Sequence, residues 1–429
     1  MKTPEDIFNF AQYTDPCVKC AKCVPVCTIH NVNADEVTSP RGFLDLLGAY
    51  QRGQLELDAN AKDIFESCFL CTACVEVCPK SLPTDMVIEQ VRSDIAKKFG
   101  IAWYKRAFFL LLRHRWLNDL AFKMGWVFQT CGFKIKADID SMHSRFSIPM
   151  LKADRLLPSL KKTSFLNSHP ENINNGGKRK VAVFIGCLGN YNYKNVGDSL
   201  LNILEHLEID AFLAKSQKCC SAPAYFTGDF DTVDYNAKFN IEYFEGFSKD
   251  VEAIIVPEAT CSAMLKIDYE HYFHDQPEWK ARAIAVKDKI FMATEWLEKH
   301  THLNELLEAK EQDSQVVTYH DPCHAKKMQG IYEEPRSLIS KNYEIVEMSD
   351  PNSCCGFGGV TMQSEKYHFA KAAGVPKAAM IKKTMADVVS AECSACRMQI
   401  TSAMGIESET VFKNPIELIA DALNSKDKI

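Results

Sequence analysis

The sequence predicts an α+β chain of several domains, in which a small, mostly helical N-terminal domain precedes a duplicated α/β domain. Eight cysteines in two short runs mark the N-terminal domain. From Lys180 onward, short apolar strands alternate with helical stretches, which is typical of α/β domains with mainly parallel strands. The alternation occurs twice with cysteines at matching places, so this half of the chain is an internal repeat.

The length of 429 residues is enough for about three domains. We expect the domain of cysteine runs at 1–100, a helical connector and linker at 101–178, the first repeat at 179–300 and the second repeat at 301–429. The composition is that of an ordinary globular protein. The net charge of −6 gives no support for nucleic-acid binding, so no nucleic-acid partner is expected.

The two runs read Cys17-x2-Cys20-x2-Cys23-x3-Cys27 and Cys68-x2-Cys71-x2-Cys74-x3-Cys78-Pro79. This spacing wraps three thiolates around one iron–sulfur cube, while the fourth cysteine of each run ligates the other cube. We therefore expect two 4Fe–4S clusters, one held by Cys17, Cys20, Cys23 and Cys78 and one by Cys68, Cys71, Cys74 and Cys27. Zinc sites usually show two separated cysteine pairs, and disulfide scaffolds are short secreted chains, so neither explains the runs. Thr28 follows Cys27 where proline is usual, which weakens the motif only slightly.

Two helices are expected in the same domain. Ser39-Pro40-Arg41-Gly42 opens an apolar stretch with proline near its start. The segment from Asp85 to Lys98 places apolar residues at helical spacing. The N-terminal domain is therefore predicted to be a two-cluster, ferredoxin-like domain.

Residues 101–130 mix aromatic side chains, among them three of the five tryptophans, with lysines and arginines. Such a mixture suits a helix that lies in the headgroup plane of an anionic membrane. A helix pair packed between domains or against a partner protein explains it equally well. Cys131 is expected to be a small buried hydrophobe without a cluster role. The stretch from about 135 to 178 ends in a polar segment with Gly and Pro and reads as a linker.

In each repeat an apolar strand ends at a cysteine, a Cys-Cys pair follows, and a second strand ends at a further cysteine. The first copy holds Cys187, Cys219, Cys220 and Cys261, and the second holds Cys323, Cys354, Cys355, Cys393 and Cys396. Sheets of this kind bind ligands at the carboxyl ends of their strands, so a cofactor is expected there. Five thiols exceed the needs of one cube or one zinc, and we favour an iron–sulfur cluster in the second copy. In the first copy Met264 is taken to replace the fifth cysteine, which leaves zinc, an ordinary cube or no metal open.

Two histidines flank a cysteine of the second copy. His320 and His324 lie close to Cys323 and are candidates to donate protons to a quinone or a thiol. The alternative is that they hydrogen-bond the backbone or a cluster sulfur.

Other neighbours of the cysteines bear on the cofactor. Lys218 and Arg397, each beside a cysteine, would offset the negative charge of thiolate-bound clusters, or else lie on the surface. Gly356-Phe357-Gly358-Gly359 is expected to let backbone approach a cluster. No G-x-G-x-x-G follows a strand, so the chain gives no sign of a dinucleotide fold.

Cysteines kept reduced for metal indicate the cytoplasm. The first residues, MKTPEDIFNF, show neither a secretory signal nor a twin-arginine pair. No apolar run is long enough for a membrane-crossing helix, so none is expected to cross a membrane. We expect a cytoplasmic chain whose peripheral contact with the cytoplasmic membrane would come from residues 101–130.

The pattern Cys…Cys-Cys(-Gly)…Cys-x2-Cys resembles the cysteine-rich CCG domain of heterodisulfide reductases. The first copy departs from it at Ser221, where Gly is usual, and at Met264. Two cluster runs followed by two such domains resemble the iron–sulfur subunits of anaerobic glycerol-3-phosphate dehydrogenase and of glycolate oxidase. The stretches 186–192 and 319–324 are more similar to the former, and 39–42 to the latter.

The resemblance implies an electron-transfer subunit in a membrane-associated complex. A separate flavoprotein would oxidise glycerol-3-phosphate, glycolate or lactate, and this chain would pass the electrons to quinone. The resemblance also offers a rival function, reduction of a disulfide at the five-cysteine site, where heterodisulfide reductases hold a noncubane cluster. A zinc-stabilised docking scaffold, with only the N-terminal cubes redox active, is a third hypothesis. The incomplete first copy favours the electron relay.

Overall fold

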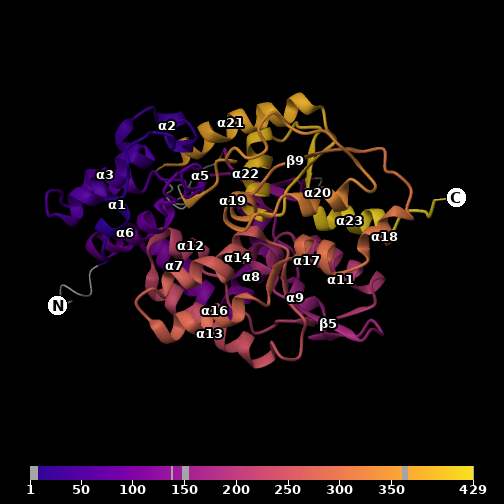
Figure 1. Cartoon of the computed structure of the whole chain (residues 1–429). Helices are drawn as coiled ribbons and strands as arrows, with labels where there is room; N and C mark the ends of the chain where they lie inside the picture. Colours follow the sequence, from indigo (N-terminus) through magenta and orange to yellow (C-terminus); the bar gives the residue numbers. More distant parts are fainter. Residues whose placement is uncertain (1–7, 137–138, 147–153, 360–365, 429) are drawn as a thin grey trace.

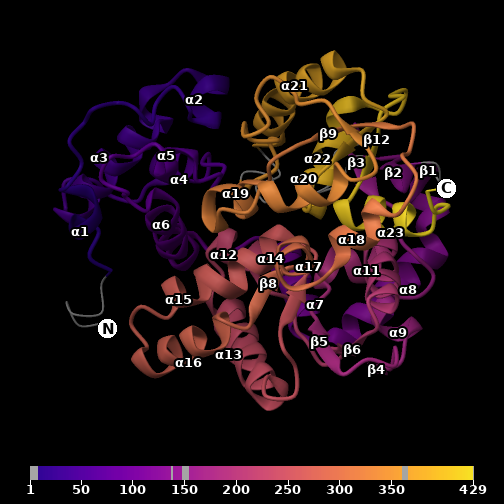
Figure 2. The same cartoon turned by 45° about the vertical axis from the view of Figure 1, so that its right-hand side comes forward.

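The computed structural model describes residues 8–136, 139–146, 154–359 and 366–428. The N-terminal domain lies at one end of the molecule, and the two repeats lie beside each other at the other end (Figures 1 and 2). The mixed helix and strand composition, with a helical first domain and a duplicated second half, confirms the predicted fold class.

Short helices joined by cysteine-bearing loops make up the N-terminal domain. They are α1 (Ala11–Thr14), α2 (Thr28–Asn33), the 3-10 helix η2 (Glu36–Thr38), α3 (Pro40–Gln51), α4 (Ala59–Phe65), α5 (Ala73–Glu76) and α6 (Thr84–Phe99). The two expected helices are confirmed as α3 and α6. Ser39 caps α3 because its hydroxyl accepts a hydrogen bond from the Gly42 amide at 3.0 Å, and Pro40 occupies the first turn.

The connector begins with a pair of helices, α7 (Trp103–Arg113) and α8 (Arg115–Gly132). Phe109 and Leu112 of α7 are buried, whereas Trp103 and Trp116 are 76% and 67% exposed. Cys131, at the end of α8, is exposed, so the expectation of a buried thiol is wrong. Its position on the outer face of the last turn of α8 leaves it without the apolar neighbours that the prediction assumed.

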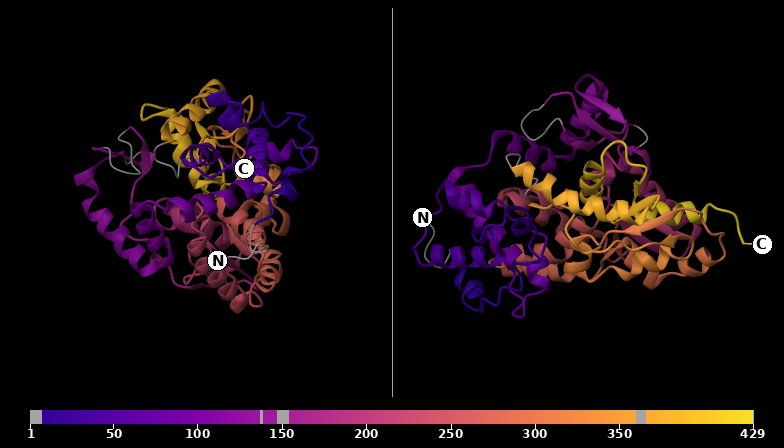
Figure 3. Two further views of the ribbon diagram at one scale, coloured as in Figure 1. Left: turned by 90° about the vertical axis from the view of Figure 1, so that its left-hand side faces the viewer. Right: turned by 90° about the horizontal axis from the view of Figure 1, so that it is seen from above.

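The stretch expected to be a linker is structured. It contains the antiparallel sheet of β1 (Phe133–Lys136), β2 (Ser141–Ser144) and β3 (Leu156–Pro158), then α9 (Phe165–Ser168) and β4 (Asn172–Ile173). These strands are too short to show a period in the sequence. They form a hairpin region beside α8, at the upper edge of the right-hand view in Figure 3.

The first repeat is built on a five-stranded sheet of order β4-β6-β5-β7-β8, parallel except for β4. Its strands are β5 (Arg179–Val183), β6 (Ile209–Leu213), β7 (Ile254–Val256) and β8 (Ile290–Met292). Its helices are α10 (Gly186–Tyr191), α11 (Lys194–His206), α12 (Ala222–Thr227), α13 (Phe230–Phe247), α14 (Ala259–Ala263), the π-helix η4 (Met264–Asp268), α15 (Tyr269–Tyr272), α16 (Pro277–Lys287) and α17 (Ala293–His300).

The second repeat has a four-stranded parallel sheet of order β10-β9-β11-β12, the same order as β6-β5-β7-β8. Its strands are β9 (Val316–Tyr319), β10 (Glu344–Ile345), β11 (Val388–Ser390) and β12 (Val411–Lys413). Its helices are α18 (Leu303–Glu308), α19 (Cys323–Gln329), α20 (Glu333–Ile339), α21 (Tyr367–Thr384), α22 (Ser394–Met404) and α23 (Pro415–Leu423). The matching strand order confirms the duplication.

The N-terminal domain is fixed to both repeats through buried polar contacts. The Arg92 guanidinium donates to the Phe65 and Cys68 carbonyls in its own domain and, at 3.0 Å, to the Phe226 carbonyl of the first repeat. Lys366 of the second repeat pairs with the Asp63 carboxylate at 2.7 Å. A buried guanidinium is costly unless its donors are satisfied, so Arg92 specifies how these domains pack.

Candidate functional site

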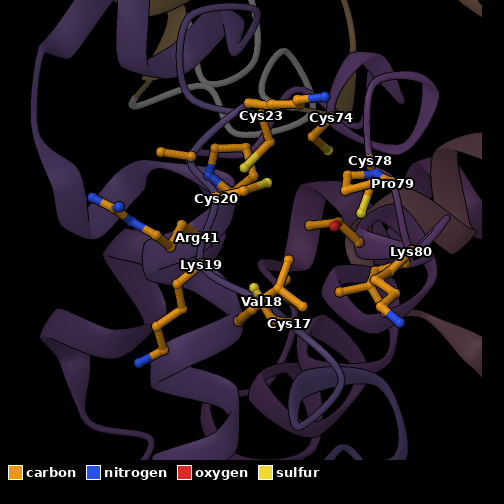
Figure 4. A pocket seen from close by; sticks show the side chains of 16 residues that line it. Cys17, Val18, Lys19, Cys20, Cys23, Arg41, Cys74, Cys78, Pro79 and Lys80 are labelled. Carbon is orange, nitrogen blue, oxygen red and sulfur yellow. The ribbon is translucent and has the colours of Figure 1, made fainter.

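One pocket of the N-terminal domain gathers the four cysteines expected for the first cluster. Its wall contains Cys17, Cys20, Cys23 and Cys78, and also Cys74. Figure 4 shows the sulfur atoms around a common space, while the Lys19 side chain extends outward. The thiols are only partly buried and Cys20 is exposed, so this pocket opens to the surface.

A second pocket gathers Cys27, Cys68, Cys71 and Cys74, the four cysteines expected for the second cluster. Burial raises the pKa of Cys27 and of Cys68 to about 12. A buried thiolate therefore needs compensating positive charge, which a bound metal group supplies. The pocket wall also contains Thr28, which stands where the motif usually has proline.

The backbone of the two runs repeats the same conformation. Lys19 and Ala21 in the first run, and Leu70 and Thr72 in the second, all have positive φ between 53° and 62°. Left-handed backbone costs a non-glycine residue of order 1 kcal/mol, so four such residues at matching positions are held there by the loops they form. Their effect is to turn the cysteines of each run toward one point.

Thr28 takes over the place of the usual proline with a different role. Its hydroxyl lies 3.4 Å from Cys71 Sγ. When Cys71 is a thiolate ligand, the sulfur carries no proton and the hydroxyl is the donor. Hydrogen bonds to ligand sulfurs raise the reduction potential of a cluster, so the departure from the motif supplies an interaction that proline would lack.

Thr28→Val is therefore expected to lower the reduction potential of the second N-terminal cluster. A hydrogen bond contributes about 1 kcal/mol, which for one electron corresponds to a shift of about 40 mV. EPR-monitored redox titration of the purified chain measures this shift. Thr38→Val, on the buried threonine of η2, is the matched control because its hydroxyl donates to the Asp35 carbonyl and not to a cysteine. An equal shift in both variants would contradict the role of Thr28.

The second pocket lies directly against the second repeat. The thiols of Cys71 and Cys354 are hydrogen-bonded to each other. The glycine-rich loop after Cys355 packs on the same run, since the Gly359 amide donates to the Phe69 carbonyl at 2.8 Å. A Cβ on Gly358 would lie only 2.0 Å from that carbonyl oxygen, so only glycine allows this approach. The glycine-rich loop thus packs closely on the second cysteine run, and its approach to a cluster stays a prediction.

The five cysteines of the second repeat come from three segments that meet at the carboxyl end of its sheet. They are Cys323 at the start of α19, Cys354 and Cys355 after β10, and Cys393 and Cys396 at the start of α22. The Cys355 and Cys396 sulfurs are 3.5 Å apart. Hydrogen bonds from Cys354 and Cys396 lower the pKa of Cys355 to about 5, which favours the thiolate that metal binding requires.

His320 adds a nitrogen to this site. Its Nδ1 lies 3.1 Å from the Pro351 carbonyl and therefore carries the proton, which leaves Nε2 with a free lone pair. Nε2 is buried and has no hydrogen-bond partner among the described residues, and His320 forms a group with Cys355 and Cys396 whose ligand atoms lie within 4.8 Å of one another. Burial lowers the pKa of His320 well below its usual value, so the ring is neutral. An orphaned buried nitrogen facing thiols fits a bound metal group.

The other flanking histidine is turned toward Cys323. His324 Nδ1 lies 3.4 Å from the Cys323 sulfur, and the ring stacks on Phe226 of the first repeat. Burial lowers the pKa of His324, so this ring is also neutral. Its geometry agrees with the expected alternative of a hydrogen bond to a cysteine sulfur.

The positive charge at this site comes from a residue that the sequence argument did not single out. Burial by itself lowers the pKa of Lys327, but the nearby Cys71, Cys323 and Cys354 outweigh it and raise the pKa. Lys327 therefore stays charged between the second N-terminal pocket and the five-cysteine site. Its position one turn after Cys323 on α19 was the available signal.

The two cations expected to offset cluster charge are engaged elsewhere. Lys218 donates to the Arg113 carbonyl at 2.7 Å. Arg397 is buried and pairs with Glu417 at 2.9 Å, so its charge is already balanced.

The first repeat brings its four cysteines together in the same way. Cys187 and Cys219 have sulfurs 3.0 Å apart, and Cys220 is hydrogen-bonded to both Cys219 and Cys261. Hydrogen bonds from Cys187 and Cys220 lower the pKa of Cys219. Ser221 has φ 77° and Gly356 has φ 91°, so the serine adopts the left-handed turn that glycine supplies in the second copy.

The equivalence assumed between Met264 and Cys396 is wrong. Val183 pairs with Ile255 in the first sheet, and Tyr319 pairs with Ser390 in the second. Cys187 lies four residues after Val183, and Cys323 lies four residues after Tyr319, so these two strand ends are equivalent. Their partners Ile255 and Ser390 are then equivalent as well. Three residues further along the chain, Glu258 corresponds to Cys393.

The same register makes Cys261 the counterpart of Cys396, and both occupy the third position of their helices α14 and α22. The sequence carried a signal for this, because the spacing from Cys220 to Glu258 equals the spacing from Cys355 to Cys393.

Comparisons with known proteins agree with this architecture. The family described as "Cysteine-rich domain" (CCG) matches residues 181–266 and 317–401, and the "4Fe-4S dicluster domain" matches residues 13–82. The chain is 30% identical over 405 residues to the "Probable glycolate oxidase iron-sulfur subunit" of Bacillus subtilis, covering 92% of this chain and 89% of that protein.

Two further similarities are more limited. "Lactate utilization protein A" of Bacillus licheniformis is 30% identical over 252 residues, which cover 58% of this chain and 100% of that protein. A solved structure of a hypothetical protein from Helicobacter pylori has a TM-score of 0.52 at 12% identity and covers 98% of this chain and 74% of that one. The latter likeness shows the fold alone.

Proposed function

Because the chain belongs to the family of cysteine-rich iron–sulfur subunits that includes the Bacillus subtilis protein, we propose that it relays electrons from a flavoprotein dehydrogenase to quinone at the cytoplasmic membrane. The observation that carries this proposal is the close contact between Cys71 of the second N-terminal pocket and Cys354 of the five-cysteine site, whose sulfurs lie within hydrogen-bonding reach of each other. It joins the N-terminal cysteine pockets to the five-cysteine site, so the three sites form one continuous series.

The cysteine groups fit iron–sulfur clusters. Cys17, Cys20, Cys23 and Cys78 would hold one 4Fe–4S cluster, and Cys68, Cys71, Cys74 and Cys27 the other. Cys323, Cys354, Cys355, Cys393 and Cys396 would hold a further cluster. When bound, such clusters accept and donate single electrons.

The protein's own contribution is to set the electrostatic environment of these clusters. Lys327 places a positive charge where the second N-terminal pocket meets the five-cysteine site, which favours the reduced, more negative state there. Thr28 donates to Cys71 on the other side of that junction. Thr28 raises the potential of the second N-terminal cluster, which favours electron transfer to it from the first, and Lys327 stabilises negative charge where that cluster meets the second repeat.

The names of the relatives suggest which dehydrogenase is the partner. Glycolate and lactate are 2-hydroxy acids, and we infer that the flavoprotein oxidises a substrate of this class; glycerol-3-phosphate is the remaining candidate. Anaerobic purification of the tagged chain from its own membranes tests the proposal. A stoichiometric flavoprotein whose substrate reduces the bound clusters is the expected result, and a chain that arrives alone would contradict it.

Membrane contact would be made by the α7–α8 surface, defined here as the exposed apolar side chains Trp103, Leu110, Trp116, Leu120, Met124, Val127 and Phe128. None of the described helices is both long and apolar enough to cross a bilayer. The exposed Arg106 and Lys123 lie among these apolar residues. An apolar face flanked by basic residues favours the interface of an anionic membrane.

Trp116→Glu combined with Phe128→Glu is expected to weaken binding to vesicles that contain anionic lipid by roughly tenfold or more, because two aromatic side chains no longer enter the interface. Vesicle co-sedimentation measures the effect. Met385→Glu, on a residue that is 87% exposed in the second repeat, is the matched control. Unchanged vesicle binding together with loss of the flavoprotein would instead assign this surface to a partner protein.

A second candidate function is disulfide reduction at the five-cysteine site. The observation that favours it is the complete set of five thiols with the low pKa of Cys355. Reduction of a low-molecular-weight disulfide by the isolated chain with a low-potential electron donor would support this function over the relay.

A further inference from the structure

The first repeat contains a buried carboxylate at a place where the second repeat has a thiol. Glu258 is the N-cap residue of α14, and Cys393 is the N-cap residue of α22. Both residues follow the central strands β7 and β11 at the same place in the sheet register. The sheet register, the helix position and the spacing from the Cys-Cys pair therefore agree on one equivalence.

Glu258 faces the first site. A Cβ built on Gly186, the residue before Cys187, would lie 3.0 Å from Cys261 Sγ and 3.8 Å from Glu258 Cγ. The Glu258 side chain thus lines the same space as the Cys261 sulfur. Glu258 is buried, and a hydrogen bond with Cys220 lowers the pKa of Cys261, but burial and the charge of Glu258 outweigh it and raise that pKa.

Met264 does not compete for this position. It follows Cys261 by three residues, in the π-helix η4, and corresponds to Gln399 of the second repeat. Met264 is fully buried in the apolar core that includes Leu265 and Tyr269. Its burial is that of a core side chain.

We infer that Glu258, and not Met264, occupies the fifth ligand position of the first site, so that this site offers a metal group four thiolates and one carboxylate. The inference rests on one part of the proposed function, namely that the five cysteines of the second repeat hold a cluster. Carboxylate is a hard oxygen donor, whereas thiolate is soft, so the two sites of one chain would hold different groups.

The Glu258 carboxylate has lone pairs available for a metal in addition to its hydrogen bonds. The Ser394 amide at the start of α22 is 3.0 Å and 2.8 Å from the two oxygens of Glu258. The Cys393 thiol is also hydrogen-bonded to this carboxylate. A carboxylate offers about four lone-pair sites, so these donors leave others available. Because this donor belongs to the second repeat, Glu258 also links the first site to the helix that carries Cys393 and Cys396.

The test places a fifth thiol in the first site after the second site has been disabled. In a Cys355→Ala background, Glu258→Cys is expected to restore one five-thiolate cluster per chain, detected by EPR and Mössbauer spectroscopy. Met264→Cys in the same background is the matched control and is expected to restore none. The signals of the two N-terminal clusters report that each variant has folded.

Restoration by Met264→Cys, or its absence with Glu258→Cys, would overturn the inference. A wild-type chain without any five-thiolate signal would contradict the proposed content of the second site but not the placement of Glu258. In that case the metal content of the Glu258→Ala and Met264→Ala variants shows which of the two residues is a ligand of the first site. Loss of metal only with Glu258→Ala supports the inference, and equal metal in both variants overturns it.

Discussion

Cys71→Ser is expected to stop electron delivery to a quinone analogue while the partner flavoprotein continues to reduce an artificial dye. Cys71 lines the second N-terminal pocket and is hydrogen-bonded to Cys354 of the five-cysteine site. Its loss removes one of four ligands from the cluster and also the contact between the two sites. Quinone reduction is expected to fall to background, and parallel assays with dye and quinone on the purified complex measure both activities.

Cys131→Ser is the control for this variant, because Cys131 is exposed and lies outside the cysteine groups. It is expected to leave both activities unchanged. If dye and quinone reduction fall together in Cys71→Ser, either the relay is wrong or the complex has come apart. Size-exclusion chromatography of the variant separates these two outcomes.

The parts of the fold that the sequence predicted well are local. A capping serine and a first-turn proline predict α3, and apolar residues at helical spacing predict α6. The cysteine runs place their members within a few residues of one another, so their grouping into pockets follows from short-range backbone geometry. The mainly parallel pairing of strands in the repeats follows from the alternation of strand and helix.

The contacts between segments that are distant along the chain could not be predicted from the sequence. Nothing in the motifs around Cys71 and Cys354 indicates that these thiols touch, because their contact depends on how the N-terminal domain packs against the second repeat. Lys327 gains its role only at that junction. Likewise, β1 to β3 have three or four residues each, and so short a strand shows no alternation that distinguishes it from a linker.

The predicted equivalence of Met264 and Cys396 was wrong for another reason. Matching Met264 to Cys396 aligned the last sulfur-containing residues of the copies, whereas the fold keeps the distance from the strand to the helix. Counting from Cys220 and Cys355 gives the correct partners, Glu258 and Cys393. The chemical kind of a side chain is thus a weaker guide to equivalence than its place after a strand.

Cys355→Ala is expected to abolish a cluster signal distinct from those of the two N-terminal cubes. Cys355 has a pKa lowered to about 5 by hydrogen bonds from Cys354 and Cys396, so it is the thiol of this site that ionises most readily. It is also the thiol grouped with Cys396 and the free nitrogen of His320. Removal of this thiol leaves the site one ligand short, and the iron content is expected to fall by the share of one cluster, measured by iron analysis together with EPR.

Cys220→Ala is the matched variant, since Cys220 is the counterpart of Cys355 in the first repeat. The signal assigned to the five-cysteine site is expected to survive in it, because its thiol lies against Cys219 and Cys261 and not against the second repeat's cysteines. Iron content that is unchanged in Cys355→Ala would remove the cluster from the second repeat. The chain would then carry electrons through its N-terminal pockets alone, and the contact between Cys71 and Cys354 would serve packing instead of transfer.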